Sequence, residues 1–267
     1  MGLEKRLYNH LLPPSANTIT YFCHEGIIKA TYMAQKVRLV LPDGRKFDLP
    51  QVTAASGIRY SNGTIEFWSK GANAFVTANS KIIYSDGIAG TVRFLNRNTA
   101  VFIDSGKTFS FHYPRGFGLS GKGIGFTTDW RAGATESGMV LALVTIPKSH
   151  LPQTNFNGAE FIVGQSSDPR AIQHCFEKLE GYGARMEQVK IKGVFFIKFT
   201  FSDAGAGNLY ETVSYRTKRG DACYVVEYTI HSSNIGMYSP DQGIQEFNKA
   251  VIENLLEKMV GSFRFLR

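Results

Sequence analysis

Residues 56–71, SGIRYSNGTIEFWSKG, place a turn signal between two short runs that are rich in apolar and aromatic residues. Asn62-Gly63 is the strongest short hairpin signal, because both residues tolerate the positive φ that a type I′ turn requires. The stretch therefore predicts a β-hairpin with a two-residue loop. Its predicted cross-strand pairs are Ser61 with Thr64, Tyr60 with Ile65, Arg59 with Glu66, Ile58 with Phe67, Gly57 with Trp68, and Ser56 with Ser69.

This register gives the predicted hairpin one apolar and one charged face. Arg59 and Glu66 share the face expected to contact solvent. Ser56 and Lys70 meet at the open end, where cross-strand neighbours have Cβ atoms ~5 Å apart, so one partner molecule can contact both. The face expected to lie in the core consists of Ile58, Tyr60, Ile65 and Phe67.

Several motifs lie in and around this hairpin: Tyr21-x-Cys23, Gly26, Ser56-Gly57-x-x-Tyr60, Phe67-Trp68-Ser69-Lys70-Gly71 and Ala74. Together they resemble the signature of the MliC/PliC family, bacterial membrane-bound or periplasmic inhibitors of c-type lysozyme. The resemblance covers about residues 18–90. That family usually joins the cysteine of its Tyr-x-Cys motif to a second cysteine near the end of the domain, and no cysteine lies between Cys23 and Cys175 here.

The resemblance implies that Ser56 and Lys70 bind lysozyme in its active-site cleft. The Lys70 ammonium would bond to one catalytic carboxylate and the Ser56 hydroxyl to the other, and the sequence leaves open which pairs with which. It further implies that the chain is no enzyme, has no catalytic residue of its own and requires no cofactor. The expected supporting residues are Gly57, Tyr60, Trp68 and Gly71.

Composition indicates a globular protein. Hydrophobic residues make up 43% of the 267 residues, charged residues 19%, and the formal net charge is +8. A nucleic-acid partner is not expected, because no basic run exceeds two residues. The resemblance implies the periplasm, cell envelope or exterior of a Gram-negative bacterium. No signal peptide is recognisable, so we expect that export and any membrane anchoring depend on a segment absent from this sequence.

The length of the chain and a shift in composition near residue 104 predict two domains. Residues 15–104 alternate short strands with turns, which indicates a small antiparallel β-barrel, and Asp104-Ser105-Gly106-Lys107 is interpreted as a linker. Residues 105–267 predict an α+β sandwich with an antiparallel sheet, a helix over about 168–179 and a C-terminal helix, loosely similar to the PsbP-like fold. The final helix is expected from a Ser239-Pro240-Asp241-Gln242 capping box onward, with Ile244, Phe247, Val251, Leu255 and Met259 buried.

Other motifs carry no defensible chemistry. Gly116-x-Gly118-x-x-Gly121-Lys122 lacks the Ser or Thr and the helix that a phosphate loop requires, and neither cysteines nor histidines have metal-site spacing.

A disulfide between Cys175 and Cys223 would close a loop of about fifty residues and add about 2–4 kcal/mol in an oxidising compartment. Cys23 would then be a buried free thiol. The alternative function left open is an envelope binding or scaffolding protein with its ligand site in the C-terminal part.

Overall fold

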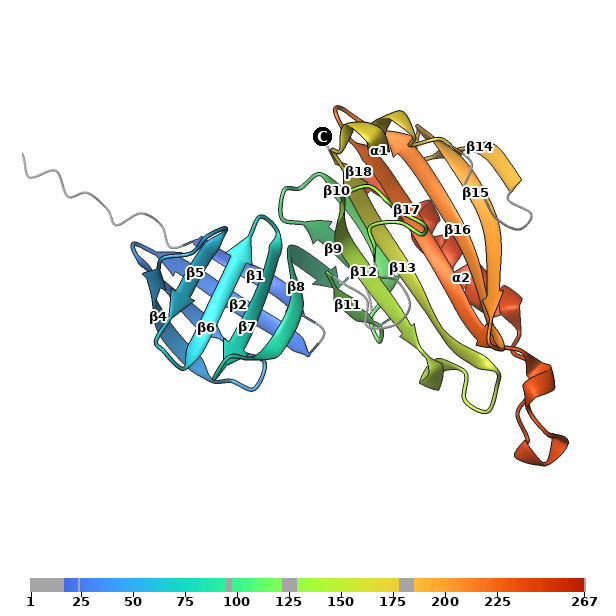
Figure 1. Cartoon of the computed structure of the whole chain (residues 1–267), viewed down its shortest axis with the longest axis horizontal. Coiled ribbons are helices and arrows are strands. Elements are labelled where there is room, and N and C mark those ends of the chain that lie inside the picture. Colours follow the sequence, from blue (N-terminus) through green and yellow to red (C-terminus); the bar gives the residue numbers. More distant parts are fainter. Residues whose placement is uncertain (1–16, 24, 95–97, 122–128, 178–184, 267) are drawn as a thin grey trace, which may run out of the picture.

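A closed antiparallel barrel forms the N-terminal part of the protein (Figure 1). The computed structural model describes residues 17–23, 25–94, 98–121, 129–177 and 185–266. Consecutive strands pair along the chain, and β1 returns to β8 through Tyr21–Ala89 and Phe22–Ile88, which closes the barrel. The predicted small antiparallel barrel is confirmed. Its strands are β1 (Asn17–Cys23), β2 (Gly26–Met33), β3 (Lys36–Val40), β4 (Lys46–Val52), β5 (Ile58–Ser61), β6 (Ile65–Lys70), β7 (Asn73–Ala78) and β8 (Lys81–Phe94).

The register of the β5–β6 hairpin differs from the predicted one by two residues. Tyr60 pairs with Phe67, whereas an Asn62-Gly63 loop would pair it with Ile65. Of the two loop residues only Gly63 has positive φ, +90°. The Asn62 side-chain oxygen instead accepts the backbone N–H groups two and three positions on, at 3.0 and 2.8 Å. An Asx turn therefore replaces the predicted type I′ turn.

The predicted faces of this hairpin survive, because a shift of two residues preserves the alternation. Tyr60 and Phe67 are buried in the barrel. Arg59 and Glu66 lie outside, with Nη2 and Oε1 3.8 Å apart. The expectation that Ile58 belongs to the core is wrong, since its side chain is 43% exposed beside the end of the barrel.

Beyond the barrel, β8 continues into a ribbon with β9 (Thr99–Asp104), β10 (Phe109–Pro114) and β18 (Arg264–Phe265). The residues interpreted as a linker form the β9–β10 hairpin turn. The Asp104 carboxylate stabilises this turn by accepting backbone N–H groups of Gly106, Thr108 and Phe109 at 2.6–3.0 Å. β8 is one continuous strand that belongs both to the barrel and to this ribbon. The division into domains at residue 104 stays a prediction.

The C-terminal part contains a seven-stranded antiparallel sheet, so the predicted antiparallel sheet is confirmed. Strand β13 (Phe156–Ser166) lies inside the sheet between β12 and β17. Glu160, 1% exposed, and Gly164 interrupt the apolar pattern that normally identifies an interior strand. The order is β11 (Gly118–Ser120), β12 (Met139–Pro147), β13, β17 (Cys223–Ser233), β16 (Asn208–Lys218), β15 (Val194–Gly205) and β14 (Arg185–Ile191).

The C-terminal helix exists but begins later than predicted. The Ser239 capping box is present, yet it caps only a 3₁₀ turn, Pro240–Gln242, which ends at Gly243 with φ +64°. Helix α2 (Lys249–Ser262) begins after Asn248, whose side chain accepts the backbone N–H of Ala250. Its buried residues are Ile252, Leu256, Met259 and Val260, whereas Val251 is 48% exposed, so the predicted stripe is partly wrong.

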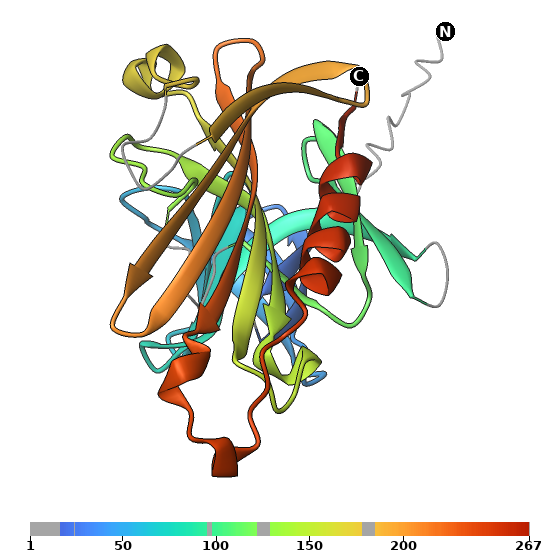
Figure 2. The ribbon, with the colours of Figure 1, turned by 90° about the vertical axis from the view of Figure 1, so that its right-hand side faces the viewer.

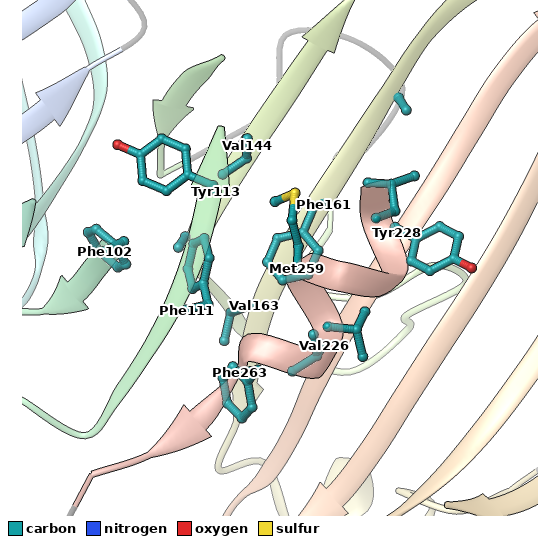
Figure 3. Close-up of a cluster of buried hydrophobic side chains, with 14 of the residues drawn as sticks. Phe102, Phe111, Tyr113, Val144, Phe161, Val163, Val226, Tyr228, Met259 and Phe263 are labelled. Atoms are coloured by element: carbon teal, nitrogen blue, oxygen red, sulfur yellow. The ribbon is translucent and has the colours of Figure 1, made fainter. Parts of the chain in front are cut away.

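Helix α2 packs along the curved sheet and closes the main hydrophobic core (Figure 2). Met259 and Phe263 from the C-terminal end of α2 belong to this core together with Phe111 and Phe161 (Figure 3). The same cluster includes Phe22 from the barrel, so apolar packing is continuous between the two parts of the chain. Outside the core, the shorter helix α1 (Pro169–Gln173) replaces the helix expected over 168–179, of which residues 178–179 are not described.

Cys175 and Cys223 form a disulfide next to α1, with Sγ atoms 2.05 Å apart. Cys23 is a buried free thiol, and burial raises its pKa to about 12. Among the described residues, neither helix is long and apolar enough to cross a membrane.

Candidate functional site

Ser56 and Lys70 lie at the same end of the β5–β6 hairpin. The ladder ends at the pair Ile58–Ser69, so Ser56 precedes that pair by two residues and Lys70 follows it by one. Continuing the register places Gly57 opposite Lys70. Both Ser56 and Lys70 are exposed. The structure thus places both residues on the surface at the same end of the hairpin, and their joint role in binding stays a prediction.

Gly57 and Trp68 fix the main chain at Ser56. Gly57 has φ +68°, and a Cβ there would lie 2.6 Å from the carbonyl oxygen of Ser69. The Trp68 indole N–H donates to the Ser56 carbonyl oxygen at 3.0 Å. The same indole stacks on Phe75, with ring centroids 5.2 Å apart. The predicted supporting role of Trp68 therefore has a specific geometry: its side chain ties the Ser56 backbone to β6.

Inside the barrel, tyrosine side chains support the strand that carries Lys70. Tyr60 stacks on Phe67 with a centroid distance of 6.3 Å. The Tyr32 hydroxyl donates to Ser69 Oγ at 3.2 Å and lies 2.7 Å from the Tyr21 hydroxyl. Burial raises the pKa of Tyr21 and keeps its hydroxyl neutral. A buried chain of three hydroxyl groups thus holds β6 immediately before Lys70.

Lys70 is available to a partner molecule. Its ammonium has no hydrogen bond or ion pair with any residue that the structure describes. Gly71 then turns the chain with φ +57°, and Lys70 pairs with Asn73 across the β6–β7 turn. Because an exposed lysine gains little from a surface ion pair, a strong interaction here requires a partner that excludes water from the ammonium.

Two residues of this surface were not predicted. Asn73 lies opposite Lys70 and Phe75 opposite Trp68, so all four side chains point outward from the barrel. The signal was present in the sequence, because 73–78 alternates outward and inward positions as a strand does. The pairing of β7 with β6 places the outward-pointing residues of β7 beside Trp68 and Lys70.

A second group of charged residues lies buried on the outer face of the C-terminal sheet. Arg131 and Glu136 form an ion pair at 2.8 Å. Glu227 Oε1 accepts the backbone N–H of Ala132 at 2.8 Å, and burial raises the pKa of Glu227. Burial lowers the pKa of Arg216 to about 10. These residues hold the 129–138 segment on the sheet, and no His, Cys, Asp and Glu cluster among the described residues could hold a metal ion.

Comparison with known proteins is consistent with the barrel geometry. Residues 21–84 match the family described as membrane-bound lysozyme-inhibitor of c-type lysozyme. A membrane-bound lysozyme inhibitor of C-type lysozyme from Yersinia enterocolitica serotype O:8 / biotype 1B is 46% identical over 80 residues. The match covers 28% of this chain and 66% of that relative. The resemblance of the N-terminal part is thereby confirmed, and the family is one of inhibitors, a non-enzymatic class. No solved structure matches the chain.

Proposed function

We propose that this protein inhibits c-type lysozyme by inserting Ser56 and Lys70 into the active-site cleft of the enzyme. The observation that carries the proposal is their joint exposure at one end of the hairpin, within the segment that matches the inhibitor family. The relative's printed name supports the same partner. Inhibition by such a plug requires no catalytic group in this chain.

The chemistry of the cleft suits this pair. Lysozyme keeps one carboxylic acid protonated in an apolar pocket and a second carboxylate ionised. The Lys70 ammonium provides a charge-assisted hydrogen bond to a carboxylate, and the Ser56 hydroxyl donates to or accepts from the other group. Occupying both groups excludes the substrate and disturbs the protonation states on which cleavage depends.

The net charge of +8 acts against encounter with a basic lysozyme. At physiological salt, however, charges farther apart than ~8 Å are largely screened. The desolvated contact between Lys70 and a cleft carboxylate is not screened in this way. Local pairing therefore determines affinity, and net charge mainly affects the association rate.

The proposed site of action is the bacterial cell envelope, where an inhibitor would protect peptidoglycan from host lysozyme. The printed description of the relative as membrane-bound supports this location. Oxidising conditions outside the cytoplasm also suit the Cys175–Cys223 disulfide.

The test is Lys70→Ala in the full chain, assayed by the turbidity of cell walls treated with hen or human lysozyme. Truncating a desolvated charged anchor typically costs ~2–4 kcal/mol, so the inhibition constant is expected to rise about 30- to 700-fold. Ser56→Ala is expected to weaken inhibition in the same direction. Lys81→Ala is the matched control, because Lys81 is an exposed barrel lysine outside the hairpin. Unchanged inhibition by Lys70→Ala would falsify the assignment.

A further inference from the structure

A cleft lies beside the proposed site, between the barrel and the C-terminal part. It has a volume of about 500 Å³. Trp68, Asn73 and Phe75 line it on the barrel side, and Ser137 and Met139 line it on the opposite side. Neither the family signature nor the proposed Ser56–Lys70 contact accounts for this cleft.

The cleft is continuous with the surface that carries Lys70. Trp68 and Lys70 alternate with buried Ser69 along β6, so both point outward. Their cross-strand partners, Phe75 and Asn73, share that face. A partner molecule seated on Lys70 therefore meets the mouth of the cleft one residue pair away.

One hydrogen bond joins the two walls, and further contacts order the far wall. The Gly121 N–H donates to the Asp86 carbonyl oxygen at 2.7 Å, which joins the end of β11 to β8. On the far wall, Trp130 Nε1 donates to the Glu136 carbonyl oxygen at 3.1 Å. The Arg131–Glu136 ion pair, with side chains 5% and 9% exposed, anchors the same segment. The cleft is thus formed before any partner binds, which lowers the entropic cost of binding.

The residues at the cleft suit a side chain that is both basic and apolar. Ile82 and Met139, which are 62% and 52% exposed, give the lining accessible apolar surface. Asp86 lines the cleft, and its carboxylate has no hydrogen bond or ion pair with a described residue. Asp129 adds a second acidic side chain to the lining. Asp86 therefore gives the cleft wall a negative charge that no described residue offsets by an ion pair, in a chain of net charge +8.

We propose that the cleft is a second contact region for the lysozyme partner and receives one of its arginine side chains. The proposal rests on the function proposed above. In this arrangement the guanidinium packs against the Trp68 ring and pairs with Asp86, while the alkyl stem contacts Met139. Charge complementarity favours this occupant, because a c-type lysozyme is a basic protein. The C-terminal part of the chain then contributes directly to inhibition.

The experiment measures the affinity of full-length variants for hen lysozyme by titration calorimetry at low and physiological salt. Asp86→Asn is expected to weaken binding about tenfold and to reduce the dependence on salt, since one charge pair is lost. Asparagine suits the positive φ of Asp86, +52°. Met139→Ser is expected to weaken binding about threefold through lost apolar contact. The controls are Asp221→Asn and Met186→Ser, which change an exposed aspartate and an exposed methionine outside the cleft.

The outcomes separate this inference from the proposed function. If Lys70→Ala loses affinity while Asp86→Asn and Met139→Ser bind as the parent does, the cleft is not a contact and only this inference is overturned. If the parent chain does not bind lysozyme, both proposals are overturned. Equal loss in the cleft variants and their controls would also overturn the inference, and unchanged circular dichroism and melting temperatures exclude misfolding as the cause.

Discussion

Gly57 and Gly71 flank the proposed contact residues, and both have a positive φ, +68° and +57°. Their surroundings differ. A Cβ on Gly57 would lie 2.6 Å from the Ser69 carbonyl oxygen and 3.1 Å from the Trp68 ring, whereas a Cβ on Gly71 would have no heavy atom within 4 Å. Gly57 therefore allows both a backbone conformation and a close approach of Trp68, and Gly71 allows only the conformation.

This difference predicts unequal effects of alanine. Gly71→Ala should cost about 1–2 kcal/mol of unfolding free energy, because only the backbone strain is added. Gly57→Ala should cost more and also weaken lysozyme binding, since main chain and indole must both move away from the new methyl group. Urea unfolding and an inhibition assay measure the two effects. Equal destabilisation by both substitutions would contradict the steric argument.

At the same scale, sequence reasoning identifies the correct end of the hairpin but not its pairing. The Asn-Gly dipeptide predicts a loop, yet the Asn62 side chain can bond to the backbone instead of adopting positive φ. Asn73 lies opposite Lys70, and identifying it as part of this surface requires knowledge of the β6–β7 pairing. Identifying Met139 requires knowledge of contacts with a segment remote in sequence. Long-range juxtaposition of this kind has no local signal.

Among the secondary-structure elements, β13 and α2 show where local patterns fail. Glu160 in β13 and Glu227 in β17 are buried acidic residues, and the 129–138 segment covers Glu227, which accepts the backbone N–H of Ala132. A capping motif predicts a helix start at Ser239, but Gly243 ends that turn and α2 begins only after Asn248. Strands with regular alternation, such as β3 and β6, are the ones that sequence predicts well.

Glu227 gives a prediction for the pH dependence of stability. Burial raises its pKa in the folded protein above the unfolded value of about 4.3. As pH rises from the unfolded value through the folded value, the folded state holds more protons than the unfolded state, so this group lowers stability with rising pH. Glu227→Gln removes this contribution, since an amide oxygen can still accept the Ala132 N–H.

Melting temperatures measured from pH 4 to pH 8 test this expectation. The melting temperature of Glu227→Gln minus that of the parent should become more positive as pH rises. Glu246→Gln, which changes an exposed glutamate, serves as the control and should show no such trend. A difference that decreases with pH would mean that Arg216 and Arg131 stabilise the charged form more than burial disfavours it.

For the whole molecule, one hydrophobic cluster joins the barrel to the C-terminal sheet. Phe22 and Ile88 from the barrel belong to the hydrophobic cluster whose members Phe111, Phe161 and Met259 are labelled in Figure 3. The C-terminal strand β18 also pairs with β10, so the end of the chain returns to the ribbon that leaves the barrel. We therefore expect the two parts to unfold in one cooperative transition.

The two tryptophans test this cooperativity, because Trp68 lies in the barrel and Trp130 lies against the C-terminal sheet. In the Trp130→Phe variant the fluorescence of Trp68 reports unfolding of the barrel. In the Trp68→Phe variant the fluorescence of Trp130 reports unfolding of the C-terminal part. Phe161→Ala, at a fully buried position, should cost about 3–5 kcal/mol and lower both urea midpoints together. Phe195→Ala, at a 58% exposed position, should shift neither. If Phe161→Ala left the urea midpoint reported by Trp68 unchanged, the barrel would be stable independently of the shared core. Unfolding in one cooperative transition would then be excluded.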